Sequence, residues 1–309
     1  TVCSILYYCV KYERRDFLNL LEENEYVLKI VASAKLWLLF ACQNGDQKLV
    51  RILLNFGVDV NCEDEDGRTP VYLAVSRGHE HVTNILFDKG AKLKTLYHKK
   101  NTLLHTACES GNEVLVETLL QRGLNINACN TNNLTPLHLA CLNGYEGVVK
   151  VLISNRANLN AFDKNGRSAL YLALLEDRDN IVSLLIKSGV DVNAANEEGR
   201  TILHLASENG HYTVVNKLLS LGADPNCTDK KGLRPLHLSR QQSHEETSEL
   251  LSSRGANVNA VEENGNSEES FEEDSNLNHK VSNNNGLLRK RKDFEVNHAL
   301  SRVVQIRPT

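Results

Sequence analysis

Apolar residues recur along the chain at helical spacing, in two short runs separated by a glycine. In the segment TPLHLACLNG (135–144) the first run ends before Gly144, and the second run carries Val148, Val149, Leu152 and Ile153. Residues with this spacing fall on one face of a helix. The pattern therefore predicts a pair of helices, with the apolar stripe of the second facing its neighbours.

The helix pair repeats every 33 residues, and the period runs from Leu36 to Arg234 without an insertion or deletion. Segments equivalent to 134–144 begin at Arg68, Asn101, Arg167, Arg200 and Leu233. One unit of this size cannot bury its own apolar face, so its stability must come from stacking on its neighbours. The sequence therefore predicts a repeat protein.

The polar residues of each unit have structural roles. Thr135 stands where a helix begins and can cap its first turn, and Pro136 follows at the first helical position. His138 falls at the third helical position, where a polar side chain can reach back to the cap backbone. The same slot holds His105, His204 and His237, but Tyr72, Tyr171 and Leu39 in other units. A site that needs imidazole would not tolerate this exchange, so we expect these histidines to be structural.

Two further residues mark the boundaries of each unit. Gly144 recurs as Gly45, Gly78, Gly111 and Gly210, just past a short helix, where a left-handed backbone favours glycine. Asn160 recurs as Asn61, Asn127, Asn193, Asn226 and Asn259. We expect its amide to tie adjacent turns together.

These residues resemble the ankyrin-repeat family, whose unit runs through a turn, a TPLHLA-type helix, a glycine, a second helix with V-x-x-LL and a G-A-D-x-N ending. The best match is NLTPLHLACLNGYEGVVKVLISNRANLNA (133–161). The resemblance implies an all-α fold, an ankyrin-repeat solenoid of stacked helix-turn-helix units with β-turn fingers. Seven repeats are expected, at 30–62, 63–95, 96–128, 129–161, 162–194, 195–227 and 228–260.

The two ends of the repeat array depart from this pattern. Residues 1–29 align as a degenerate N-terminal capping repeat, with Leu20 and Leu21 at the LL position. The seventh repeat has lost several framework residues, which leads us to expect fraying there; the replacements are Arg234, Ser239, Ser243 and Ser252.

The net charge and the cysteine content limit the kinds of partner and of cellular compartment that the sequence predicts. The formal net charge is −4, so no global basic field favours direct binding of nucleic acid. The chain has eight cysteines, no C-x-x-C and no secretory leader, which predicts a reducing, cytoplasmic setting. The cysteines share repeat slots, so we expect them to pack rather than pair. Because the chain starts at Thr1 and has no methionine, we expect it to be a fragment.

The composition changes after residue 260. Residues 261–309 are first acidic and then basic, and we expect most of this tail to be disordered. Ser270 lies among the acids and matches an acid-directed phosphorylation site. Arg289, Lys290, Arg291 and Lys292 form a basic run that is either a nuclear import signal, giving a second compartment, or a solvated charge run.

No motif for catalysis or for a cofactor rises above background. The sequence has no phosphate-binding loop, zinc-protease helix, nucleophile elbow or dinucleotide glycine motif. His79, Glu80 and His81 cluster, but a metal site would need further ligands that their spacing does not supply. We therefore expect no catalytic residue, no metal, no cofactor, no small-molecule substrate and no membrane insertion.

The expected function is binding of a protein partner. The resemblance implies a concave groove made by the finger tips and the first helices. Leu142 and Leu175 are apolar where the framework needs no apolar residue, and Leu134 is expected in the same region beside Tyr145. Local packing is the alternative for these leucines. The candidate partner-binding residues are Leu134, Leu142, Asn143, Tyr145, Leu175, Glu176, Arg77, Glu109, Lys99 and Asn132.

We thus expect a non-enzymatic intracellular adaptor, scaffold or inhibitor. The solenoid with an acidic tail and a basic run is loosely similar to ankyrin inhibitors that retain Rel-type transcription factors. An alternative is the recognition domain of a larger enzyme, such as a ubiquitin ligase or kinase, or of a channel. Catalysis by the chain itself would need residues outside the repeat framework, and none stands out.

Overall fold

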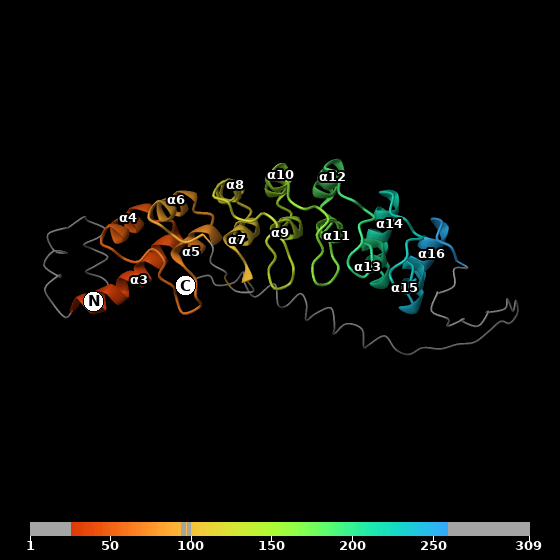
Figure 1. Cartoon of the computed structure of the whole chain (residues 1–309), viewed down its shortest axis with the longest axis horizontal. Helices are drawn as coiled ribbons and strands as arrows, with labels where there is room; N and C mark the ends of the chain where they lie inside the picture. Colours follow the sequence, from red (N-terminus) through yellow and green to blue (C-terminus); the bar gives the residue numbers. More distant parts are fainter. Residues whose placement is uncertain (1–25, 94–96, 98–99, 259–309) are drawn as a thin grey trace, which may run out of the picture. The chain divides into compact units, whose positions relative to one another are not determined.

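The computed structural model describes the backbone of residues 26–93, 97 and 100–258, and the side chains from residue 34 onward. Within this part the chain forms fourteen α-helices and no strand, which confirms the all-α class (Figure 1). Most of the expected N-terminal cap, Lys99, Ser270 and the run from Arg289 to Lys292 lie outside the described residues.

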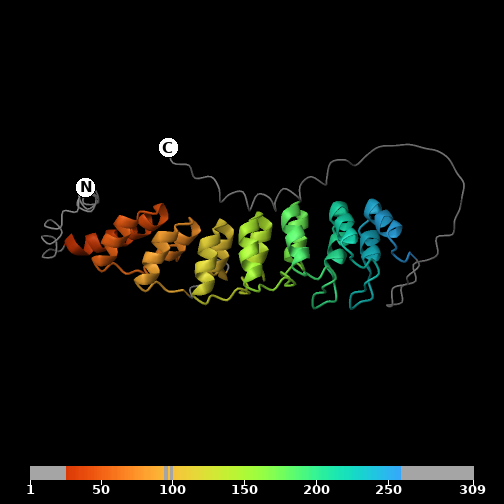
Figure 2. The same ribbon diagram turned by 90° about the horizontal axis from the view of Figure 1, so that it is seen from above.

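The helices come in pairs, one pair in each 33-residue interval (Figure 2). The first helices from α3 to α11 pack on one another in a row, α13 packs on α15, and each first helix also packs on its own second helix. The pairs are α3 (Tyr26–Asn44) and α4 (Gln47–Asn55), α5 (Pro70–Ser76) and α6 (Glu80–Asp88), α7 (Leu103–Ser110) and α8 (Glu113–Gln121), α9 (Pro136–Asn143) and α10 (Glu146–Ser154), α11 (Ala169–Leu175) and α12 (Asp179–Lys187), α13 (Ile202–Glu208) and α14 (Tyr212–Ser220), and α15 (Pro235–Gln241) and α16 (Glu245–Ser253).

The predicted capping role of the histidines is confirmed. At the start of α9 the Thr135 N–H donates to Nδ1 of His138 at 3.1 Å, and the Thr135 hydroxyl lies 2.8 Å from the same nitrogen. Thr102 with His105 and Thr201 with His204 repeat this capping box. In α7, α9 and α13 two of the exposed amides at the helix start are thus satisfied within the helix's own first turn.

The second nitrogen of each of these histidines joins two repeats. Because Nδ1 accepts a backbone N–H, Nε2 carries the proton and donates to a carbonyl of the next repeat. The His105 Nε2 lies 3.0 Å from the Leu134 oxygen, and the His138 Nε2 lies 3.2 Å from the Arg167 oxygen. His204 makes the same bond to Leu233 at 3.1 Å. One side chain therefore caps a helix and fastens it to its neighbour.

The asparagine that ends each repeat also joins neighbours, as expected. The Asn193 Oδ1 accepts the N–H of Asp224 at 2.8 Å, and its Nδ2 donates to the Gly222 oxygen at 3.2 Å. The corresponding oxygen accepts a backbone N–H from the following repeat in Asn61, Asn127, Asn160 and Asn226.

The seventh repeat keeps both helices in spite of its substitutions. The Arg234 N–H still donates to Nδ1 of His237 at 3.2 Å, but the guanidinium has no acceptor with which to cap α15. The buried Ser239 hydroxyl bonds the Leu236 oxygen at 3.0 Å and the Ser248 hydroxyl at 2.8 Å. These bonds offset the polarity of serine at an alanine slot, and the fraying of this repeat stays a prediction.

A few glycine slots of the repeat hold other residues without a change in the backbone. Arg156 (φ 64°) stands in the slot of Gly123 (φ 84°) and Gly189 (φ 81°). Asp177 (φ 51°) stands in the slot of Gly144 (φ 79°). Side chains with a Cβ disfavour this left-handed region, so stacking holds both residues in a strained conformation.

Candidate functional site: a protein-binding surface

The predicted partner-binding residues separate into two groups in space. Asn132 is exposed at a finger tip, where its carbonyl accepts the N–H of Lys164 at 3.0 Å. The second group lies at the far ends of the first helices, with four exposed polar members: Arg77, Glu109, Asn143 and Glu176. The length of a first helix separates the two groups.

Leu142 and Leu175 occupy the same slot of α9 and α11, two helices that pack on each other. Leu175 is 36% exposed, and Leu142 is half-buried. The slot holds Glu109 in the preceding repeat and Glu208 in the following one. An apolar pair therefore faces outward along this row of helices beside the exposed Glu109, while Glu208 lies on the offset helix α13 and is paired with Arg200.

The expected adjacency of Leu134 and Tyr145 is wrong. Leu134 precedes α9 and Tyr145 follows it, so the eight residues of the helix hold them ~12 Å or more apart. Leu134 packs against the core, and its carbonyl accepts the His105 Nε2–H. Leu134 is therefore largely a framework residue, in the finger-end group.

Tyr145 represents a slot whose role was not recognised in the sequence. Its ring lies so close to Gly111 of the preceding repeat that a Cβ there would come within 2.7 Å of the ring. His79 lies equally close to Gly45, and its Nε2 is 3.0 Å from the Gln43 oxygen. The residue that opens each second helix thus fits over the turn of the repeat before it.

The same slot accounts for His79, one member of the cluster His79, Glu80 and His81. His79 has a structural role between repeats, as its contact with Gln43 shows. Within the part of the chain that the structure describes, no group of three potential ligands is placed to hold a metal ion.

The cysteines in the first-helix slot are packing residues, as expected. Cys42, Cys108 and Cys141 are completely buried. Burial raises the pKa of each of these thiols far above its ordinary range, so they stay protonated and unreactive.

A cavity of about 670 Å³ opens between the fifth and sixth repeats. Its walls are finger 5 (residues 162–168) and finger 6 (residues 195–201), the β-turns that precede α11 and α13. Leu205 and Glu208 of α13 line its inner side. We call this cavity the finger cleft.

The finger cleft coincides with a change in how the repeats stack. At this junction α11 lies against α14, and α13 is offset from the row of α7, α9 and α11 (Figure 1). Tyr171 replaces the capping histidine, and its hydroxyl lies 2.9 Å from Nδ1 of His211. Lys217 of α14 pairs with Asp177 at 3.0 Å and Asp179 at 2.9 Å. The junction is thus held at the end away from the fingers.

The charges around the finger cleft are unequally neutralised. Arg200 binds Glu208 at 3.0 Å and Asp229 at 3.2 Å. Burial opposes ionisation of Asp229, but N–H bonds from Leu233 and Lys231 together with Arg200 outweigh it and hold its pKa below the ordinary value. Arg200 is therefore already matched by carboxylates and adds little positive field to the cleft.

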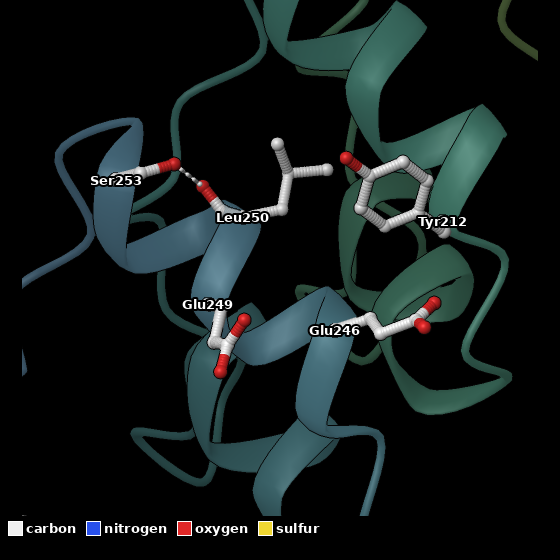
Figure 3. A pocket seen from close by; sticks show the side chains of 5 residues that line it. All are labelled: Tyr212, Glu246, Glu249, Leu250 and Ser253. Atoms are coloured by element: carbon white, nitrogen blue, oxygen red, sulfur yellow. Dashed lines mark hydrogen bonds between the residues drawn. The ribbon is translucent and has the colours of Figure 1, made fainter.

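A second cavity, of about 530 Å³, lies between α14 and α16. Tyr212 and Leu250 face each other across it, while Glu246 and Glu249 project from α16 (Figure 3). The Ser253 hydroxyl donates to the Leu250 carbonyl at 2.8 Å. This cavity lies between the second helices, away from the fingers.

Comparisons with known proteins agree with this architecture. A family model of ankyrin repeats in three copies matches residues 6–96, 38–130, 92–163, 157–229 and 194–262. The chain therefore belongs to the ankyrin-repeat family. Its fold is that of a protein-interaction module. No helix in the described ranges has the length and apolar character needed to cross a bilayer.

Particular relatives match parts of the chain. The crystal structure of the ankyrin repeat domain of Bcl-3, described as a unique member of the IkappaB protein family, is similar with a TM-score of 0.59 and 29% identity, over 70% of this chain and 97% of that one. An ankyrin repeat protein of Fowlpox virus (strain NVSL), FPV223, is 37% identical over 79 residues, 25% of this chain and 55% of the relative. The ADP-ribosylation factor GTPase-activating protein AGD2 of Arabidopsis thaliana is 46% identical over 39 residues, 13% of this chain and 5% of the relative. The matches thus span about half of the first curated relative and a small part of the second.

Proposed function

We propose that the chain is a non-enzymatic adaptor, scaffold or inhibitor that binds a protein partner along the row of first helices and fingers. The observation that carries the proposal is the Leu142 and Leu175 pair, which faces outward in a slot that is otherwise polar in the other repeats. Apolar residues rimmed by charge are typical of the energetic centre of a protein interface.

Inhibition by covering a partner's surface is the form of this activity that the relatives favour. The Bcl-3 domain is described as a member of the IkappaB family, and it matches this chain over most of the repeat array. A relative of this kind supports a regulatory role, in which binding of the partner in the groove by itself blocks the partner's surface.

The test is capture of interacting proteins with and without the double variant Leu142→Ser and Leu175→Ser. Because neither residue is fully buried, we expect the melting temperature to change by less than ~2 °C while captured partners fall by roughly tenfold. The matched control is Val114→Ser on α8, which removes an apolar residue that is 49% exposed outside this row. A large loss of stability in the double variant, or equal capture by both variants, would overturn the proposal.

A second candidate is a recognition domain within a larger protein. The match to AGD2 covers only 5% of that protein, whose name assigns it a GTPase-activating function, and this supports a segment of this kind as one part of a longer protein. Sequencing the complete transcript decides this point. An additional domain with its own catalytic motif would mean that the binding surface recruits the substrate or regulator of that domain.

For localisation, we propose the cytoplasm, with entry to the nucleus through Arg289, Lys290, Arg291 and Lys292. Replacing these four residues with alanine in a fluorescent fusion should lower the nuclear fraction. An unchanged nuclear fraction would show that the basic run is only a solvated charge run.

A further inference from the structure

At the finger cleft, one backbone hydrogen bond that joins the neighbouring fingers on either side is not made. Lys164 of finger 5 donates its N–H to the Asn132 oxygen at 3.0 Å, and Lys230 donates to the Glu198 oxygen at 2.9 Å. The equivalent bond would run from the Glu197 N–H to the Asn165 oxygen. In the described part of the chain neither of these two groups has a hydrogen-bond partner.

The leucine of α13 that faces the finger cleft is also less buried than its equivalents in other repeats. Leu205 of α13 lines the finger cleft and is half-buried. The leucines in its slot are nearly inaccessible in other repeats, at 5% for Leu139, 1% for Leu172 and 3% for Leu238. The cleft therefore offers a backbone donor, a backbone acceptor and an apolar side chain on its floor.

The electrostatics give the cleft a preferred ligand charge. Glu197 and Glu198 are exposed on the wall that finger 6 provides, and within the described residues no cation pairs with either carboxylate. Lys164 stands on the opposite wall, but Arg200 is occupied by Glu208 and Asp229. Lys164 is exposed and makes no ion pair among the described residues, so two free carboxylates face one free ammonium across the cleft. The net charge at the finger cleft is thus negative, and its negative part belongs to finger 6.

We propose that the finger cleft binds an extended, lysine- or arginine-bearing peptide segment of the protein partner. The segment lies between the two fingers as an added strand, accepts the Glu197 N–H and donates to the Asn165 oxygen. Its basic side chain meets Glu197 and Glu198, and an adjacent apolar side chain covers Leu205. The cavity volume lies within the ~300–1,000 Å³ that ligand pockets usually have. This inference rests on the proposed function and adds the chemistry of the partner.

The experiment selects random seven-residue peptides displayed on phage against the full chain. We expect the selected peptides to be enriched in Lys and Arg, and to bind ~10-fold more weakly to the double variant Glu197→Lys and Glu198→Lys. The matched control is Glu245→Lys and Glu246→Lys, which changes charge equally on exposed residues of α16 and should alter binding less than ~2-fold. Selected peptides without basic residues, or equal weakening by both double variants, would overturn the inference.

A backbone readout separates strand addition from simple charge attraction. With a selected peptide bound, exchange of the Glu197 amide hydrogen measured by NMR should slow at least ~10-fold. The Lys230 amide already donates to Glu198 and should change little. Unchanged exchange at Glu197 contradicts the proposed binding mode.

Two further outcomes identify which idea fails. If alanine at all four positions 289–292 of the full chain strengthens peptide binding tenfold, the tail of this protein is the occupant and the assignment to a partner is wrong. If no peptide depends on Glu197 and Glu198 while Leu142→Ser with Leu175→Ser still abolishes capture, the cleft inference fails and the proposed function stands.

Discussion

Arg156 follows α10 with a φ of 64°, in a slot where the other repeats place glycine. Its side chain is exposed, and no ion pair holds it among the described residues. Replacing Arg156 with glycine therefore changes the backbone preference and removes almost nothing else.

The expected gain can be worked out from two opposing contributions. An L-residue in the left-handed region costs ~1–2 kcal/mol, and glycine loses this penalty. Glycine also has more freedom in the unfolded chain, which costs ~0.5–1 kcal/mol. Arg156→Gly should thus raise the free energy of unfolding by about 0.5–1 kcal/mol, equivalent to ~1–4 °C in the melting temperature of a domain of this size.

Urea unfolding followed by circular dichroism measures this change through the shift in midpoint. The reverse substitutions Gly123→Ala and Gly189→Ala are the controls, because a Cβ at either position meets nothing within 4 Å. They should destabilise by about 1 kcal/mol through backbone strain alone. If Gly123→Ala destabilises but Arg156→Gly gains nothing, strain at Arg156 is not the relevant quantity and the reasoning is refuted.

Two further predictions concern buried polar groups. Burial lowers the pKa of His105, His138 and His204, so below pH ~6.5 the unfolded chain binds protons that the folded chain does not. The free energy of unfolding should therefore be level above pH ~7.5 and fall as the pH drops through 6.5 toward the lowered pKa values. The loss should reach up to about 4 kcal/mol at pH 5.5 for the three histidines together. Urea midpoints measured from pH 5.5 to 8 check this, and the triple His→Gln variant should flatten the slope; an equal slope in both proteins contradicts the assignment. The Ser207 hydroxyl is buried without a hydrogen-bond partner in the described structure, so Ser207→Ala should stabilise by about 1 kcal/mol in the same assay, whereas a loss would reveal a partner for the hydroxyl.

The sequence predicted the features that are local to one repeat. Thr135, Pro136 and His138 define a helix start within four residues, and the structure has the expected capping box. The stripe of α10 was equally clear, because Val148, Val149 and Leu152 follow the helical period and are completely buried. Such features need no knowledge of how the units stack.

Features that depend on two repeats at once were harder to predict. The bond from His138 Nε2 to the Arg167 oxygen spans 29 residues and has no signature in either segment. The finger cleft depends on an offset between units with the same period. Tyr171 and Asp177 each replace a framework residue at that junction. Tyr72 fills the slot of Tyr171 in the second repeat, where α5 packs on α7, so the tyrosine alone does not predict the offset.

His105, His138 and His204, which each cap a helix and bond the next repeat, affect where the array separates under force. They link the third repeat to the fourth, the fourth to the fifth and the sixth to the seventh. Leu39, Tyr72 and Tyr171 leave the other three described junctions without this link. Among these three, the junction between the fifth and sixth repeats is also the one where the first helices, α11 and α13, do not pack closely on each other. In an array whose stability is a sum over neighbouring interfaces, such a gap divides the chain into cooperative blocks. Under mechanical load from its two ends, the described array should therefore yield first between α11 and α13, with the blocks on either side still folded.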